Sequence, residues 1–202
     1  MILISNNCLA GFVYRDILHT KYTSPFIWTA VNPDEYIQMI DEYDKLDLEN
    51  VIIDKEKEGL SNNFDIILCE KYHVHNHHMW FDEKAKIPIH SNSCDISYYK
   101  IWEYIYSNWI RRAKRAKFEN KKIFLFYDNF NVCKNPYKLT EIMYKHPEYV
   151  CIAFTDKVIK PLENLIVKKI ELSWNSEQGG WYNSFMNTYK DWLNDFLNKV
   201  SK

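Results

Sequence analysis

Cys8 is the residue whose type and position most favour chemistry in this sequence of 202 residues. Residues 1–4 form an apolar run long enough for a buried strand, and Asn6 and Asn7 can cap a helix that starts directly afterwards. The positive end of a helix dipole favours a thiolate over a thiol. The pattern therefore predicts a strand, a sharp turn and a helix, with Cys8 as a candidate nucleophile and the most reactive cysteine. The alternative is a small apolar side chain packed under the turn.

Four arginines form a second group with chemical potential. Arg111, Arg112 and Arg115 lie near the end of a long predicted helix, and Arg15 lies far away in the sequence. A guanidinium binds a carboxylate or a phosphate through two parallel hydrogen bonds. Positive charge at a helix C-terminus is also favourable in itself. The three clustered arginines are thus either a solvated helix end or a contact with an anion, such as the diphosphate of a nucleotide sugar or of a lipid carrier.

Histidines and acids offer two possible metal sites. His73, His75 and His77 alternate, so on a strand they would share one face and could converge on zinc. No convincing set of further ligands follows, and we expect a solvated strand end or loop, with no metal and no cofactor. Asp128 and Asp156 each follow an apolar run and could hold a divalent metal on a sugar nucleotide, as in a glycosyltransferase. Acids at strand ends are also common turn formers.

Apolar runs alternate with helical patterns along the whole chain. Strands are predicted at 1–4, 51–53, 64–69, 123–127 and 150–154, with an edge strand at 165–172, and helices at 9–17, 32–43, 97–117, 135–145 and 181–199. This order predicts one domain over 1–202. We expect an α/β three-layer sandwich with helices on both faces of a largely parallel or mixed sheet. Sites in such folds gather at the carboxyl ends of the strands, where Cys8, Asp128 and Asp156 could share a crevice.

Composition limits the function classes. The formal net charge of -1 gives no argument for nucleic acid or an anionic membrane as partner. No apolar run approaches the ~20 residues of a membrane span, and the N-terminus shows no secretory signal. Five scattered cysteines suggest free thiols in a reducing cytoplasm. With 4 glycines there is no glycine-rich phosphate loop, whereas 15 Tyr and 7 Trp are many and suit sugar binding.

The opening of the chain resembles an uncharacterised bacterial family. The residues that carry the resemblance are Ile4-Ser5-Asn6-Asn7-Cys8, Gly11, Val13-Tyr14-Arg15 and Tyr22-Thr23-Ser24-Pro25-Phe26. Trp109-Ile110-Arg111-Arg112 and Phe154-Thr155 are similar as well. Members of that family are associated with exopolysaccharide or capsule biosynthesis. The resemblance implies a pathway, surface-polysaccharide assembly, more than a reaction.

The same opening is also similar to papain-like cysteine peptidases, in which a histidine lies ahead of an arginine-rich helix. His90 matches that histidine here, and Asp128 supplies an acid. A Cys–His–acid arrangement would perform acyl transfer or hydrolysis through a thioester. The candidate catalytic residues are therefore Cys8, His90 and Asp128. The candidate substrate-binding residues are Asn6, Asn7, Arg15, Ser24, Arg111, Arg112 and Asp156.

Three functions follow as expectations. The first is a Cys-dependent acyltransferase or hydrolase acting on a sugar-linked substrate. The second is a non-catalytic accessory protein that binds a carbohydrate or a nucleotide sugar. The third is a glycosyltransferase-like enzyme. In each case the expected partner is a carbohydrate or nucleotide sugar, without nucleic acid and without membrane insertion.

Overall fold

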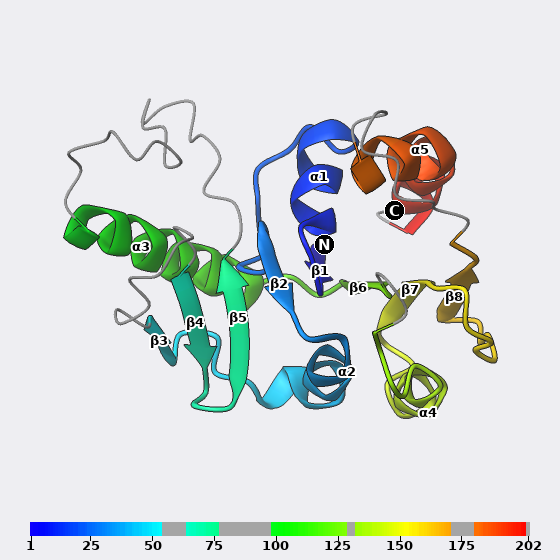
Figure 1. Ribbon diagram of the computed structural model, residues 1–202, viewed down its shortest axis with the longest axis horizontal. Coiled ribbons are helices and arrows are strands. Elements are labelled where there is room, and N and C mark those ends of the chain that lie inside the picture. The colour runs from blue at the N-terminus through cyan, green and yellow to red at the C-terminus, as the bar shows by residue number, and fades with distance from the viewer. Residues whose placement is uncertain (54–63, 77–97, 129–131, 171–179, 201–202) are drawn as a thin grey trace.

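A computed structural model describes residues 1–53, 64–76, 98–128, 132–170 and 180–200 of the chain (Figure 1). Its centre is a parallel sheet of four strands in the order β1 (Ile2–Ser5), β6 (Lys122–Tyr127), β7 (Val150–Phe154) and β8 (Leu165–Lys168). The continuous apolar runs thus form buried parallel strands, as predicted. β8 lies at the edge of the sheet, which confirms the expectation for that segment.

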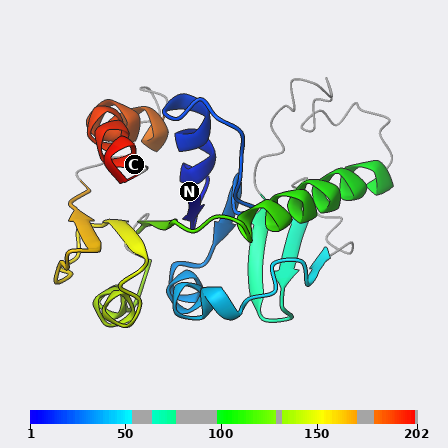
Figure 2. The same ribbon diagram turned by 180° about the vertical axis from the view of Figure 1, so that it is seen from behind.

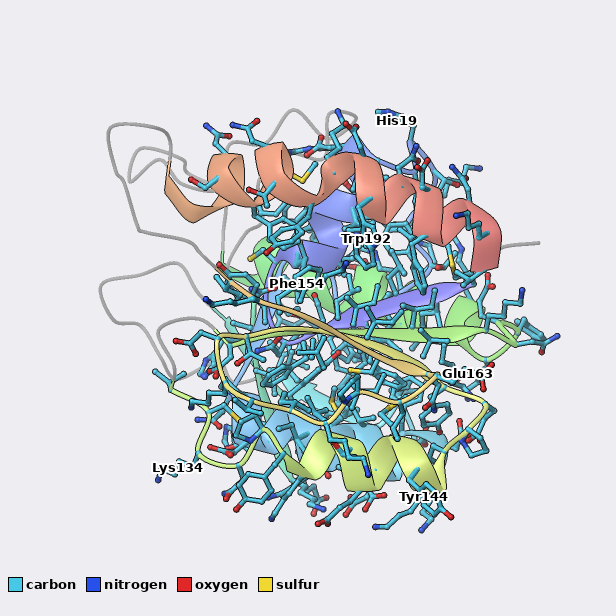
Figure 3. The ribbon with its side chains drawn as sticks, turned by 90° about the vertical axis from the view of Figure 1, so that its right-hand side faces the viewer. His19, Lys134, Tyr144, Phe154, Glu163 and Trp192 are labelled. Carbon is cyan, nitrogen blue, oxygen red and sulfur yellow. The ribbon has the colours of Figure 1, made fainter. Side chains whose placement is uncertain are left out.

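Helices cover both faces of this sheet, as the order of elements predicts. α1 (Leu9–Asp16) and α5 (Gly180–Val200) lie on one face, and α2 (Pro33–Glu42) and α4 (Lys138–Lys145) lie on the other (Figures 1 and 2). Figure 3 shows Phe154 and Trp192 between the sheet and α5, with Tyr144 on the outer side of α4. The ring of Phe154 lies 4.8 Å from that of Phe185 on α5. No helix of the described ranges is long and apolar enough to cross a membrane.

A second, antiparallel sheet lies beside the first, where the sequence pattern indicated only one. Its order is β2 (Thr29–Val31), β5 (Tyr72–Asn76), β4 (Phe64–Leu68) and β3 (Val51–Ile53). The histidine-bearing segment is therefore a paired strand. In β5, Tyr72 and Val74 are buried while His73 is exposed, which is the period-2 pattern of a sheet with one covered face.

One hydrophobic core connects the two sheets. It contains Ile4 and Phe126 of the parallel sheet, Val74 of the antiparallel sheet and Trp109 of α3 (Tyr98–Ala116). The Trp109 indole N–H donates to the carbonyl of Leu48, which precedes β3, at 2.7 Å. The 3₁₀ helix η1 (Tyr43–Lys45) links α2 to that segment. The long helix that carries the clustered arginines is thus anchored through its buried face.

The helix starts follow their capping residues. The Asn32 side chain accepts the N–H of Asp34 at 2.9 Å, and Pro33 is the first residue of α2, as predicted. At α1 the Asn7 side-chain oxygen accepts the N–H of Leu9 at 3.0 Å. The Ser5 hydroxyl accepts the next N–H of the same helix, that of Ala10, also at 3.0 Å. Side chains therefore satisfy two of the free N–H groups of α1.

Trp28 packs directly on Gly11 of α1. A Cβ atom at Gly11 would lie 2.7 Å from Cδ2 of the Trp28 ring, so a larger residue forces the ring to move. Trp28 has a φ of 58°, an unfavourable conformation for a bulky side chain. The backbone before β2 is thus held in a strained turn that lays the indole against the helix.

This contact predicts whether Gly11→Ala raises or lowers the free energy of unfolding. Alanine stabilises a helix relative to glycine by roughly 0.5–1 kcal/mol, but overpacking against the indole costs about 1–3 kcal/mol. We expect Gly11→Ala to lower the free energy of unfolding, measured by urea denaturation. In a Trp28→Ala background, the same change should raise it. A stabilising Gly11→Ala in the presence of Trp28 would contradict the contact.

Candidate functional site

Asn6 connects the ends of three strands at the carboxyl edge of the parallel sheet. Its side-chain amide donates to the carbonyl of Tyr127 at 2.9 Å and accepts the N–H of Tyr127 at 2.8 Å. Its own carbonyl accepts the N–H of Val31 in β2 at 3.0 Å. Asn6 is only 4% exposed. The amide therefore extends the β1–β6 ladder, and its polar atoms are already engaged in the fold.

Cys8 lies directly before α1, as predicted, but its thiol does not have the expected ionisation. The residue is 6% exposed, and burial raises the pKa of the Cys8 thiol to about 12, with a smaller opposing effect from a backbone hydrogen bond. The expectation of a helix-stabilised thiolate is therefore wrong. Desolvation disfavours the charged form more strongly than the helix end favours it. The first N–H groups of α1 are also taken by Asn7 and Ser5.

Asp128 is buried and fully engaged at the end of β6. Its carboxylate accepts the N–H of Cys133 at 3.0 Å and the hydroxyl of Thr155 at 3.3 Å, and it lies 3.5 Å from the ammonium of Lys157. No hydrogen bond joins it to Cys8 within the described ranges. Asp128 thus fixes the segments that follow β6 and β7. Asp156, the other predicted acid, is exposed in the turn after β7.

A further acid, Asp34, holds the same region from the start of α2. Its carboxylate accepts the N–H groups of Lys134 and Asn135, at 3.0 and 3.1 Å, and the thiol of Cys133 at 3.6 Å. The sequence analysis treated Asp34 only as part of a helix start, because these partners lie about a hundred residues away. Asp34 and Asp128 together tie the segment around Cys133 to the sheet.

The structure describes only some of the other residues that were predicted for the catalytic and metal sites. His90 lies outside the described residues, so its pairing with Cys8 stays a prediction, and Cys94 lies outside them too. His73 and His75 share one face of β5, while His77 is not described. Among the residues that the structure describes, no three His, Cys, Asp or Glu side chains are grouped to hold a metal ion.

Three of the four arginines in the sequence contact Phe12, Tyr22 or Trp28, and the fourth, Arg111, precedes Arg112 on α3. We call this set the arginine–aromatic face: Arg15, Arg111, Arg112, Arg115, Phe12, Tyr22 and Trp28. The Arg15 guanidinium lies 5.1 Å from the centre of the Phe12 ring and 5.5 Å from that of Trp28. The rings of Tyr22 and Trp28 lie 6.4 Å apart. Arg112 lies 5.4 Å from the Tyr22 ring, and Arg115 donates to the Tyr22 carbonyl at 3.3 Å. Arg15 and the α3 arginines thus share one surface.

Arg112 is the unusual member of this face. Its Nε atom is enclosed and has no hydrogen-bond partner among the described residues. Burial lowers the pKa of the Arg112 guanidinium to about 10, and the charges of Arg111 and Arg115 also lower it. None of the three is paired with a carboxylate in the described part of the chain. The solvated helix-end interpretation fits Arg111, which is exposed and donates to Asn108, whereas Arg112 is half-buried with its Nε atom enclosed.

Ser24 is buried and stabilises the backbone of its own loop instead of lining an accessible site. It is fully buried, and its hydroxyl accepts the N–H of Phe26 at 3.1 Å. Nearby, the Tyr14 hydroxyl accepts the N–H of Leu3 at 3.0 Å and contacts the Thr23 hydroxyl. These polar contacts fix the loop between α1 and β2 against the start of the sheet. The aromatic members of the arginine–aromatic face were not predicted as site residues, because a sequence pattern does not show which rings meet which arginines.

Comparisons of the chain with protein-family models, with curated proteins and with solved structures found no match. The functional argument therefore depends on the geometry and chemistry of the chain itself.

The Asn6 bridge makes a stability prediction. Asn6→Ala removes both side-chain hydrogen bonds to the backbone of Tyr127, so we expect a loss of about 2–4 kcal/mol in the free energy of unfolding. Asn7→Ala is the matched control, because it removes one helix-cap bond and should cost about 1 kcal/mol. Urea denaturation measures both. Equal losses for the two variants would contradict the structural role of Asn6.

The buried thiol of Cys8 makes a reactivity prediction. Burial raises the thiol pKa of all four described cysteines, but Cys69 is half-buried whereas Cys8, Cys133 and Cys151 are buried. With iodoacetamide at pH 8, we expect Cys69 to be alkylated first among these four. Cys8 should react only after unfolding in urea, as peptide mass mapping can show. Rapid labelling of Cys8 in the folded protein would restore it as a candidate nucleophile.

Proposed function

We propose that this chain is a binding protein for a phosphorylated sugar derivative, whose diphosphate group is held by the arginine–aromatic face. The proposed ligand class is a sugar linked to a diphosphate, carried by a nucleotide or by a lipid. The reaction itself would then belong to another protein. This function corresponds to the accessory protein expected from the sequence.

The state of Arg112 carries the proposal. A buried charge without a partner is costly, and proteins normally pair such a group or leave it in water. Arg112 is half-buried over the Tyr22 ring, and its enclosed Nε atom has no hydrogen-bond acceptor among the described residues, while Arg111 and Arg115 add positive charge beside it. An anion at this place would supply the missing hydrogen-bond acceptor and neutralise the cluster. A guanidinium matches phosphate oxygens in both charge and geometry.

The state of Cys8 supports binding over covalent catalysis. A nucleophilic thiol must be accessible and at least partly ionised near neutral pH. The Cys8 side chain is buried, and burial raises its pKa to about 12. Asp128, the acid expected to complete the catalytic arrangement, is occupied by Cys133, Thr155 and Lys157.

The pathway and location are further parts of this proposal. The resemblance of the opening to proteins of exopolysaccharide and capsule biosynthesis supports a place in surface-polysaccharide assembly. We also propose a cytoplasmic location, which the free thiols of the four described cysteines support.

Replacement of Arg112 by a neutral residue of similar size separates binding from stability. Arg112→Met removes a half-buried cation whose enclosed Nε atom has no acceptor among the described residues, so we expect the free energy of unfolding to rise by about 1 kcal/mol. The same change should weaken the binding of uridine diphosphate glucose at least tenfold, because a charged hydrogen bond is worth roughly 1.5–3 kcal/mol. Isothermal titration calorimetry and urea denaturation measure the two effects.

Lys138→Ala is the control for general charge. Lys138 is an exposed cation at the start of α4, outside the arginine–aromatic face. Its removal should leave uridine diphosphate glucose binding unchanged at moderate salt. Equal affinity of wild type and Arg112→Met for the nucleotide sugar, or a large loss of stability in Arg112→Met, would contradict the proposed function.

A further inference from the structure

We infer that the ligand of the arginine–aromatic face is a nucleotide, with its base stacked on Arg15 and its diphosphate at Arg112. This inference depends on the proposed function and selects the nucleotide-linked form of the ligand over the lipid-linked form. It assigns Arg15, Phe12 and Trp28 to one subsite, which we call the base platform.

The guanidinium of Arg15 contacts three neighbours within the described part of the chain. Its Nε and Nη2 atoms donate to the two carboxylate oxygens of Asp16, at 2.6 and 2.7 Å. Its inner side lies in the corner between the Phe12 and Trp28 rings, which stand at 87° to each other with centres 4.9 Å apart. The Arg15 side chain is nevertheless 50% exposed. A flat cation is thus presented to solvent in a defined position.

Such a surface suits the flat π system of a nucleobase. Bases stack on aromatic rings and on the planes of arginine guanidinium groups. A lipid tail would instead need a broad apolar surface, and the outermost group here is a charged guanidinium paired with the Asp16 carboxylate. The chemistry of the platform therefore favours a nucleotide.

The platform is rigid because Trp28 cannot easily move away. Its indole rests on Gly11, which has no side chain between the helix and the ring. Its φ of 58° costs free energy that the surrounding packing must offset. Strained residues of this kind are concentrated at ligand sites, where they fix a group before the ligand arrives.

The base platform is continuous with the arginines of α3. Trp28 contacts Tyr22, and Tyr22 contacts Arg112, with no step between group centres longer than 6.4 Å. A base and a diphosphate are joined in a nucleotide by a single ribose. The proposal accordingly places the base on Arg15 and the diphosphate at Arg112 and Arg115, along this continuous row of contacts.

Calorimetric titration with three probes tests the inference: uridine diphosphate, inorganic pyrophosphate and geranyl diphosphate. We expect wild-type protein to bind uridine diphosphate about tenfold more tightly than pyrophosphate, since stacking of one base supplies that preference. Arg15→Lys keeps the positive charge but removes the planar guanidinium on which the base stacks. The preference for uridine diphosphate over pyrophosphate should therefore fall to less than threefold, while the affinity for pyrophosphate stays the same. Arg112→Met should lose all three ligands, and Lys138→Ala should lose none.

The outcomes separate the two proposals. Suppose that pyrophosphate binds and that Arg112→Met abolishes its binding. If uridine diphosphate then binds no more tightly than pyrophosphate, or if its tighter binding persists in Arg15→Lys, the base platform is wrong and the proposed function stands. If geranyl diphosphate binds more tightly than uridine diphosphate, the lipid-linked ligand replaces the nucleotide. If none of the three probes binds, the proposed function itself fails.

Discussion

The packing of the Trp28 indole on Gly11 is the constraint on which the candidate site depends. It fixes the end of the loop between α1 and β2 against the helix, in a backbone conformation that a bulky residue rarely adopts. The same loop carries Tyr22, which contacts Arg112 and Arg115 of α3. The close approach of the ring to the glycine thus belongs to a continuous row of contacts from Arg15 through Trp28 and Tyr22 to Arg112.

Desolvation has opposite consequences for Cys8 and Arg112, which the sequence analysis identified as candidate site residues. At Cys8 it favours the neutral thiol, which removes the chemical advantage of a helix N-terminus. At Arg112 it lowers the pKa but leaves the guanidinium charged at neutral pH, because the value stays near 10. Burial therefore leaves Cys8 as a neutral side chain packed in the core. Arg112 stays charged, with no carboxylate partner among the described residues.

Local patterns predicted much of the fold. The apolar runs of β6 and β7, the cap at Asn32 and the cap at Asn7 are signals carried within a few neighbouring residues, and the structure confirms each of them. Of the antiparallel sheet, β3 and β4 were predicted as strands. The other two were missed because β2 has three residues and because the histidines of β5 resemble a metal motif more than a half-buried strand. Short strands depend on partners that sequence spacing does not reveal.

The candidate site was predictable only as a set of residue types. The arginines were recognised as possible anion ligands, but the convergence of Arg15 with Arg112 is a property of tertiary packing. Asn6 and Ser24 were expected to face a substrate, and both use their polar atoms to join segments of the backbone.

A crystal structure of the chain grown with inorganic pyrophosphate tests the central claim most directly. The account predicts a phosphate oxygen within hydrogen-bond distance of Arg112 Nε, with Arg115 beside it and the Tyr22 ring alongside. Pyrophosphate bound at the carboxyl edge of the parallel sheet, with Arg112 Nε donating to a carboxylate of the protein itself, would contradict it.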